Sequence, residues 1–116
     1  MSLSYQGISN PKVTAGPNFK NHFQRYRKLL ENITGKKYSK LKANGPEFLN
    51  DISELINNGT FKYVGQSTGI QNRPVWNIYK GEGLVVATKT DGEWVTLLED
   101  SDTGLAKTID TFMINK

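Results

Sequence analysis

The stretch LVVATKTDGEWVTLL, residues 84–98, decides the fold of this 116-residue chain. Strand-forming residues flank Asp91-Gly92 on both sides with a period of two, which indicates two strands joined by a tight hairpin turn. A two-residue turn would set the pairs Thr90–Glu93, Lys89–Trp94, Thr88–Val95, Ala87–Thr96 and Val86–Leu97. In this register one face forms the core, with Leu84, Val86, Val95 and Leu97. The opposite face carries Ala87, Lys89, Trp94 and Thr96.

The segments on either side of the hairpin extend it into a sheet. Residues 60–68 and 75–80 have the same period of two, so we expect an antiparallel meander with residues 84–90 and 93–99. Trp76 and Ile78 would join the core face of this sheet. Residues 105–114 follow a turn, and they suit either a fifth, edge strand or a short helix.

Two amphipathic helices are predicted before the sheet. Apolar residues recur at steps of four and three from Phe19 to Ile33, after a capping Asn18 and before Gly35. A second stripe runs from Phe48 to Ile56, with Pro46 expected at the first helical position. The sequence therefore predicts an α+β fold, with two N-terminal helices packed on one face of a four- to five-stranded antiparallel sheet.

Length and composition limit the organisation and the chemistry. A chain of 116 residues suits one domain, so we expect a flexible linker over residues 1–17 and a single domain over residues 18–116. No apolar run approaches the ~20 residues of a membrane span. Because the chain has no cysteine and one histidine, thiol nucleophiles, thiolate zinc sites and multi-histidine metal sites are excluded. We therefore expect no metal and no cofactor.

The charge is divided unevenly along the chain. Residues 1–46 hold nine basic residues against the single acid Glu31, a net charge of +8, whereas residues 47–116 hold six against ten, a net charge of −4. A basic segment with so few acids is typical of proteins that bind phosphate or another polyanion.

The basic segment also contains the only histidine. On a helical wheel His22 and Arg25 share one flank of the apolar stripe, with Lys28 further round the same side. The strand pattern places Asn77 and Tyr79 beside Lys89, Trp94 and Thr96 on the second sheet face, a candidate platform for stacking and phosphate contacts. A histidine with cations and hydroxyls can cleave RNA without metal, because the RNA 2′-hydroxyl is an internal nucleophile.

Three segments resemble bacterial polymorphic toxin domains. They are NFKNHF (residues 18–23), PEFLNDI (residues 46–52) and DGEWVTLL (residues 91–98). Over residues 18–99 the order of elements resembles the ribonuclease toxins of the barnase, EndoU, colicin and RelE superfamily, known as the BECR fold. Such domains form the C-terminal tips of contact-dependent growth inhibition proteins and of some colicins.

The resemblance implies a function and a set of partners. It implies metal-independent cleavage of RNA, often transfer RNA, with cyclic phosphate products, and a cognate immunity protein that blocks the site. A larger secreted or cell-surface bacterial protein would deliver the domain to the cytoplasm of a target cell. Whether a host cytosolic factor takes part stays open.

The resemblance also implies roles for individual residues. His22 matches the family's helix histidine, the acid/base candidate, and Thr96 matches the hydroxyl of the late strand, with Tyr79 a looser match. Arg25 would stabilise the phosphate. The residues expected to bind substrate are Lys20, Lys28, Lys89, Trp94 and Asn77. A second histidine and a barnase-like glutamate base are missing, so a lysine, Tyr79, or substrate and water could be the second proton-transfer group.

Two other classes of function fit the same residues. A non-catalytic nucleic-acid-binding module would bind RNA in a salt-sensitive way without cleaving it. A structural or protein-interaction domain would do neither, and a histidine on a helix flank is more often structural than catalytic. The strongly basic first third of the chain counts against an immunity protein, because such proteins commonly present an acidic face to a nuclease.

Overall fold

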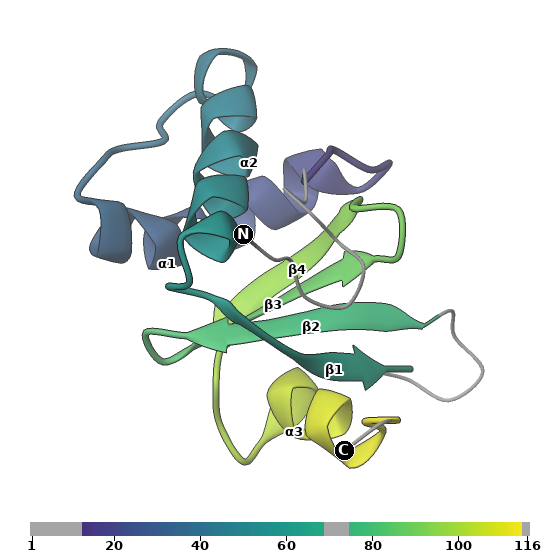
Figure 1. Ribbon diagram of the computed structural model, residues 1–116. Coiled ribbons are helices and arrows are strands. Elements are labelled where there is room, and N and C mark those ends of the chain that lie inside the picture. The colour runs from purple at the N-terminus through teal and green to yellow at the C-terminus, as the bar shows by residue number, and fades with distance from the viewer. Residues whose placement is uncertain (1–12, 69–74, 115–116) are drawn as a thin grey trace.

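Four antiparallel strands form a meander in a computed structural model that describes residues 13–68 and 75–114 (Figure 1). The strands are β1 (Lys62–Ser67), β2 (Trp76–Gly81), β3 (Leu84–Lys89) and β4 (Trp94–Glu99), and each pairs with the next in the chain. The predicted meander is confirmed, and each strand begins and ends within two residues of the expected bounds.

Helices cover both faces of this sheet. Helices α1 (Phe19–Thr34) and α2 (Leu41–Asn57) lie on one face, and the short helix α3 (Gly104–Thr111) lies on the other (Figure 1). The predicted α+β layout is confirmed, with α1 packed against β4. For residues 105–114 the sequence left a strand and a helix open, and the structure has the helix. The only strand-like pairing of this segment among the described residues is one isolated bridge between Ser67 and Met113.

The two N-terminal helices differ in how well their starts were predicted. Asn18 and Gly35 flank α1 as expected, and Gly35 ends the helix in the left-handed conformation with φ of 76°. Helix α2, in contrast, begins at Leu41 rather than at Pro46, so the proline lies inside it. The extra turn is held by Asn44, whose side-chain oxygen accepts a hydrogen bond from the Lys40 backbone N–H at 3.0 Å.

The β3–β4 hairpin is closed by a longer loop than a two-residue turn. The Gly92 N–H donates to the Lys89 carbonyl at 2.9 Å, and the Lys89 N–H donates to the Glu93 carbonyl at 2.8 Å. Gly92 takes a left-handed φ of 98°, so three residues form the loop. The pairs Val86–Leu97 and Ala87–Thr96 are as predicted, but Thr88 pairs with Trp94 across a bulge.

The bulge changes which residues share a face. Trp94 joins Leu84, Val86 and Leu97 beneath α1 and α2, whereas Val95 packs on the α3 side with Trp76 and Ile78. For Val95 and Trp94 the predicted faces were wrong because of the bulge. A bulge inserts one residue and reverses the alternation of the strand beyond it. Trp76, Ile78 and Tyr79 also lie on the faces opposite to those predicted, because in β2 Tyr79 pairs with Val86 and Ile78 with Ala87.

A cluster of aromatic rings joins α1, α2 and β4. The Phe48 ring of α2 lies 5.2 Å from the Phe23 ring and 5.0 Å from the Trp94 ring, both in edge-to-face geometry. The Tyr38 ring lies 5.5 Å from Phe48, and Phe19 contacts Phe48 and Trp94 at 6.3 and 5.7 Å. Such pairs add to the hydrophobic stabilisation of buried rings. We call these five rings the aromatic cluster.

A buried polar network anchors the connection between the helices. Tyr38, which lies between α1 and α2, is fully buried. Its hydroxyl donates to the buried Asp51 carboxylate at 2.6 Å, and Lys36 pairs with the same carboxylate at 3.1 Å. Burial, followed by the bond to Asp51, raises the pKa of the Tyr38 hydroxyl well above its ordinary value.

Both edges of the sheet are partly covered by segments outside the strands. Thr14 forms a parallel bridge with Glu93: its N–H donates to the Gly92 carbonyl, and its carbonyl accepts from the Trp94 N–H. Val13 is buried, and its N–H donates to the Ser53 hydroxyl at 2.9 Å. Residues 13–17 therefore belong to the packed domain rather than to the predicted linker, of which residues 1–12 lie outside the described residues. We call residues 13–18 the strap.

Within the described ranges, no helix combines the length and the apolar character needed to cross a bilayer.

Replacing Phe48 by alanine should destabilise the domain strongly. The ring is fully buried at the centre of the aromatic cluster, so Phe48→Ala should lower the free energy of unfolding by about 3–5 kcal/mol in urea denaturation. Phe112, 38% exposed on the far side of the sheet, is the matched control. Phe112→Ala should cost less than about 1 kcal/mol, and equal losses for the two variants would contradict the central position of Phe48.

Candidate functional site

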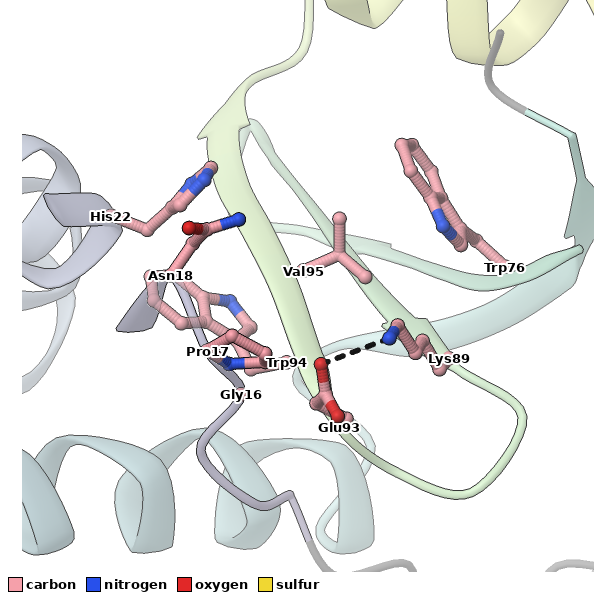
Figure 2. Close-up of a pocket in the computed structure, with 9 residues that line it drawn as sticks. All are labelled: Gly16, Pro17, Asn18, His22, Trp76, Lys89, Glu93, Trp94 and Val95. Carbon is pink, nitrogen blue, oxygen red and sulfur yellow. Dashed lines mark ion pairs between the residues drawn. The ribbon is translucent and has the colours of Figure 1, made fainter. Parts of the chain in front are cut away.

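A groove of about 290 Å³ crosses the first residues of β4 (Figure 2). Its walls come from the strap, α1, β2, the β3–β4 hairpin and β4. The lining residues are Gly16, Pro17, Asn18, His22, Trp76, Lys89, Glu93, Trp94 and Val95. Figure 2 shows Trp94, Asn18 and His22 on one side of β4 and Val95, Trp76 and Lys89 on the other. The groove therefore lies where the bulge sends Trp94 and Val95 to opposite faces, and we call it the β4 groove.

His22 sits at the edge of the buried face of α1, as predicted. Its ring stands edge-on to Trp94 with centroids 5.9 Å apart, and the centroid of the Tyr26 ring lies at the same distance. The side chain is partly buried, and Nδ1 is fully buried without a hydrogen-bond partner among the described residues. Since Nδ1 is buried, Nε2 is the nitrogen left to exchange protons with a ligand.

The surroundings of His22 favour its neutral form. Burial lowers its pKa below the ordinary value of 6.5, and the neighbouring Arg25 charge lowers that pKa further. Arg25 is exposed and lies 5.9 Å from the Tyr26 ring centre. At neutral pH the imidazole is therefore mostly uncharged, which is the form that accepts a proton.

A second, more open hollow lies on the other side of His22. It measures about 580 Å³ and is lined by Asn21, His22, Gln24 and Arg25. His22 is thus shared by this hollow and the β4 groove. The neighbouring side chains of Lys20 and Lys28 are exposed. Within the described part of the chain, Lys20, Arg25 and Lys28 form no ion pair, whereas Arg27 is paired with Glu31 at 3.0 Å.

The hairpin contributes an ion pair to the β4 groove. Lys89 Nζ lies 3.1 Å from the Glu93 carboxylate (Figure 2). The Glu93 side chain lies against Gly16 of the strap, where any Cβ would collide with the carboxylate. Because Gly16 has no side chain, the Glu93 carboxylate can lie against it and pair with Lys89 in the groove.

The structure separates the residues expected on the second sheet face. Lys89 and Trp94 line the groove, but Asn77, Tyr79 and Thr96 do not, because each is buried: they are 4%, 2% and 1% exposed. The Tyr79 ring packs edge-to-face against Tyr63 with centroids 5.6 Å apart, and Asn77 accepts a hydrogen bond from Gln66. The predicted platform was wrong because helices cover both faces of the sheet.

Thr96 is buried on the opposite side of the sheet from His22. It pairs with Ala87, which packs in the α3-side cluster. Its hydroxyl has no partner among the described residues. A role for Thr96 on the same phosphate as His22 is therefore not supported by the fold.

Three groove residues were missed by sequence reasoning. Asn18 was considered only as a helix cap, Trp76 only as a core residue, and Glu93 only as the start of a strand. The juxtaposition of Asn18 with His22 could have been found from their spacing, because positions i and i+4 share a helix face. The positions of Glu93 and Trp76 depend on the strap and the bulge, which the sequence pattern did not indicate.

The arrangement supports acid/base chemistry on an anionic ligand. A neutral imidazole and the Lys89 ammonium line the β4 groove, and Arg25 lines the open hollow with His22. Among the residues that the structure describes, no three His, Cys, Asp or Glu side chains are grouped so as to hold a metal ion. Comparisons with protein-family models, curated proteins and solved structures each gave no match.

The pKa of His22 can be measured directly, because it is the chain's only histidine. An NMR titration should give a value below 6.5. Arg25→Gln should raise this pKa without restoring it to 6.5, since burial is the larger cause. Lys107→Gln, an exposed change on α3, should leave it unchanged. A wild-type pKa at or above 6.5 would contradict the arrangement.

The same shift predicts how folding depends on pH. Because the pKa of His22 is lower in the folded state, the unfolded chain binds more protons over this range. The free energy of unfolding should therefore fall as pH drops from 6.5 through the folded pKa. In urea denaturation His22→Gln should lose this part of the pH dependence, and an unchanged profile in the variant would show that another group causes it.

Proposed function

We propose that this chain is a metal-independent endoribonuclease. The observation that carries the proposal is the position of the single histidine, partly buried between the β4 groove and an open hollow, with its pKa lowered and Arg25 beside it. Histidine is the side chain whose ordinary pKa lies nearest neutrality. An RNA substrate supplies its own nucleophile, so no metal is needed to generate one.

The reaction is an internal transesterification. Neutral His22 takes the proton of the 2′-hydroxyl through Nε2 while the 2′-oxygen attacks the phosphorus. The bond from phosphorus to the 5′-oxygen then breaks, leaving a 2′,3′-cyclic phosphate on one fragment. The departing 5′-oxygen takes a proton from the Lys89 ammonium or from water. Tyr79, considered as an alternative donor, is buried under the helices and is not proposed for this step.

Positive charge around His22 would stabilise the transition state. The attack produces a phosphorane whose oxygens carry more negative charge than the phosphodiester. Arg25 lines the hollow beside His22, and Lys20 and Lys28 lie exposed on the same helix without ion pairs among the described residues. Trp76, which lines the β4 groove and is partly exposed, offers an aromatic face on which a base can stack.

The biological setting follows from the resemblance to BECR-fold toxins. That resemblance rests on the three sequence segments and on the predicted order of elements over residues 18–99. We extend the proposal to transfer RNA as the substrate, to inhibition of bacterial growth, to a cognate immunity protein that covers the site, and to delivery by a larger secreted or cell-surface protein. A basic site of this kind is best blocked by an acidic partner.

Cleavage in the absence of metal is the direct test. Purified protein incubated with total bacterial RNA in EDTA should release fragments ending in cyclic phosphate, with transfer RNA as the preferred target. His22→Ala should reduce the rate at least ~100-fold while keeping salt-sensitive RNA binding and a cooperative unfolding transition. Intact RNA after incubation with wild-type protein would exclude the nuclease, and binding without cleavage would favour a nucleic-acid-binding module instead.

The contribution of Arg25 can be separated from net charge. Arg25→Gln should lower kcat/KM for RNA about tenfold and reduce the slope of log affinity against log salt by roughly 0.7–0.9, the change expected for one lost phosphate contact. Lys107→Gln removes the same charge from α3, far from the groove. If both variants lose activity equally, general charge rather than the Arg25 position is responsible.

A further inference from the structure

Asn18 occupies the capping position of α1 without capping it. Asparagine at this position normally accepts a hydrogen bond from a backbone N–H of the first turn. Here its φ and ψ are −101° and 16°, outside the extended conformation that capping requires, and its side chain forms no capping bond. No other hydrogen bond of the Asn18 carboxamide is formed among the described residues. Asn18 is exposed, so its carboxamide is open to water and to a ligand rather than bonded to the protein.

The strap fixes Asn18 in this conformation. The Thr14 bonds to Gly92 and Trp94 hold the strap on the edge of β4. Gly16 then turns the chain, and its carbonyl accepts a hydrogen bond from the Phe19 N–H at 3.1 Å. These contacts set the backbone one residue before the helix. The placement of Asn18 is thus determined by the sheet edge rather than by the helix that follows.

The freed carboxamide lies in the β4 groove beside His22. The backbone carbonyl of Asn18 accepts a hydrogen bond from the backbone N–H of His22 at 3.2 Å. The two residues are therefore one helical turn apart on the same face. Figure 2 shows the Asn18 carboxamide between the His22 ring and Trp94, with Pro17 below it. Trp94 lines the same groove, and its buried indole N–H also lacks a partner among the described residues. Two hydrogen-bond donors next to the imidazole are therefore uncommitted.

We infer that the Asn18 carboxamide is a catalytic residue that donates a hydrogen bond to a non-bridging oxygen of the scissile phosphate. This inference rests on the proposed ribonuclease function and assigns the group that recognises the reacting phosphate. A neutral donor beside the imidazole stabilises the growing charge on that oxygen without repelling either reactant. The site then combines a base at His22, a positive charge at Arg25 and an amide donor at Asn18.

Substitutions at a capping position separate this role from a structural one. Because Asn18 forms no capping bond, its replacement by serine or aspartate removes none, and an aspartate at this position also interacts favourably with the helix dipole. Asn18→Ser and Asn18→Asp should therefore unfold at a temperature equal to or above that of wild type. Neither residue supplies an amide donor. A purely structural asparagine would tolerate both changes with unchanged activity.

The experiment compares kcat, KM and thermal unfolding for wild type and the two variants on RNA in EDTA. Asn18→Ser should lower kcat about 100-fold with KM changed less than about threefold, because the lost bond is strongest in the transition state. Asn18→Asp should lower kcat further, and its carboxylate should raise the pKa of His22 in an NMR titration. Asn50→Ser, an exposed change on α2, is the matched control and should behave as wild type.

The outcomes distinguish this inference from the proposed function. If wild-type protein cleaves RNA and Asn18→Ser cleaves at the same rate, the inference is wrong and the nuclease stands. Loss of activity that only parallels a lower unfolding temperature in both variants would make Asn18 structural and also overturn the inference. If wild-type protein cleaves no RNA, both proposals fail together.

Discussion

The packing of Trp94 against α1 and α2 is the contact on which the rest of the molecule depends. Its indole is 3% exposed, it meets the Phe48 and Phe19 rings edge-on, and His22 stands edge-on against it. The same side chain therefore closes the core between helices and sheet and forms the floor of the candidate site. Its position depends in turn on one inserted residue, because the bulge at the start of β4 directs Trp94 beneath the helices. Without that bulge the indole would face α3, and His22 would lose one of its two aromatic neighbours.

Much of the architecture could be predicted from the sequence, because the signals involved are local. The order of elements followed from the change of period after Gly59, the apolar stripes of the two helices and the Asp91-Gly92 turn. In the hairpin, the pairs Val86–Leu97 and Ala87–Thr96 were also predicted correctly. The faces at the start of β4 could not be predicted, because an Asp-Gly pair fits both a two-residue and a three-residue loop, and only the latter carries the bulge. The sequence also left residues 105–114 undecided between strand and helix. That choice determines whether the second sheet face is open or covered.

The candidate site was predictable to the extent that it lies on one helix. The wheel placed His22 and Arg25 together, and the structure has both on the same hollow. The residues drawn from the sheet were less successful, since Tyr79, Asn77 and Thr96 were expected on a free surface and are buried. Polar and aromatic residues in strands satisfy packing and hydrogen bonding as readily as they bind ligands, and the sequence pattern does not distinguish the two. Contacts between distant segments, such as Gly16 with Glu93, carry no sequence periodicity at all.

The strap gives the site a mechanical vulnerability that the rest of the fold does not share. Thr14 is held on β4 by only two backbone hydrogen bonds, while the four-stranded meander and the aromatic cluster lie behind it. A force applied to the chain ahead of residue 13, as when a protein is drawn through a narrow channel by that end, first reaches the Val13–Ser53 hydrogen bond and then those two bonds. Peeling the strap away removes one wall of the groove and releases Asn18 before the core yields. Under such a force the site loses its structure before the core unfolds. It forms again only when the strap has rebound to the edge of the sheet.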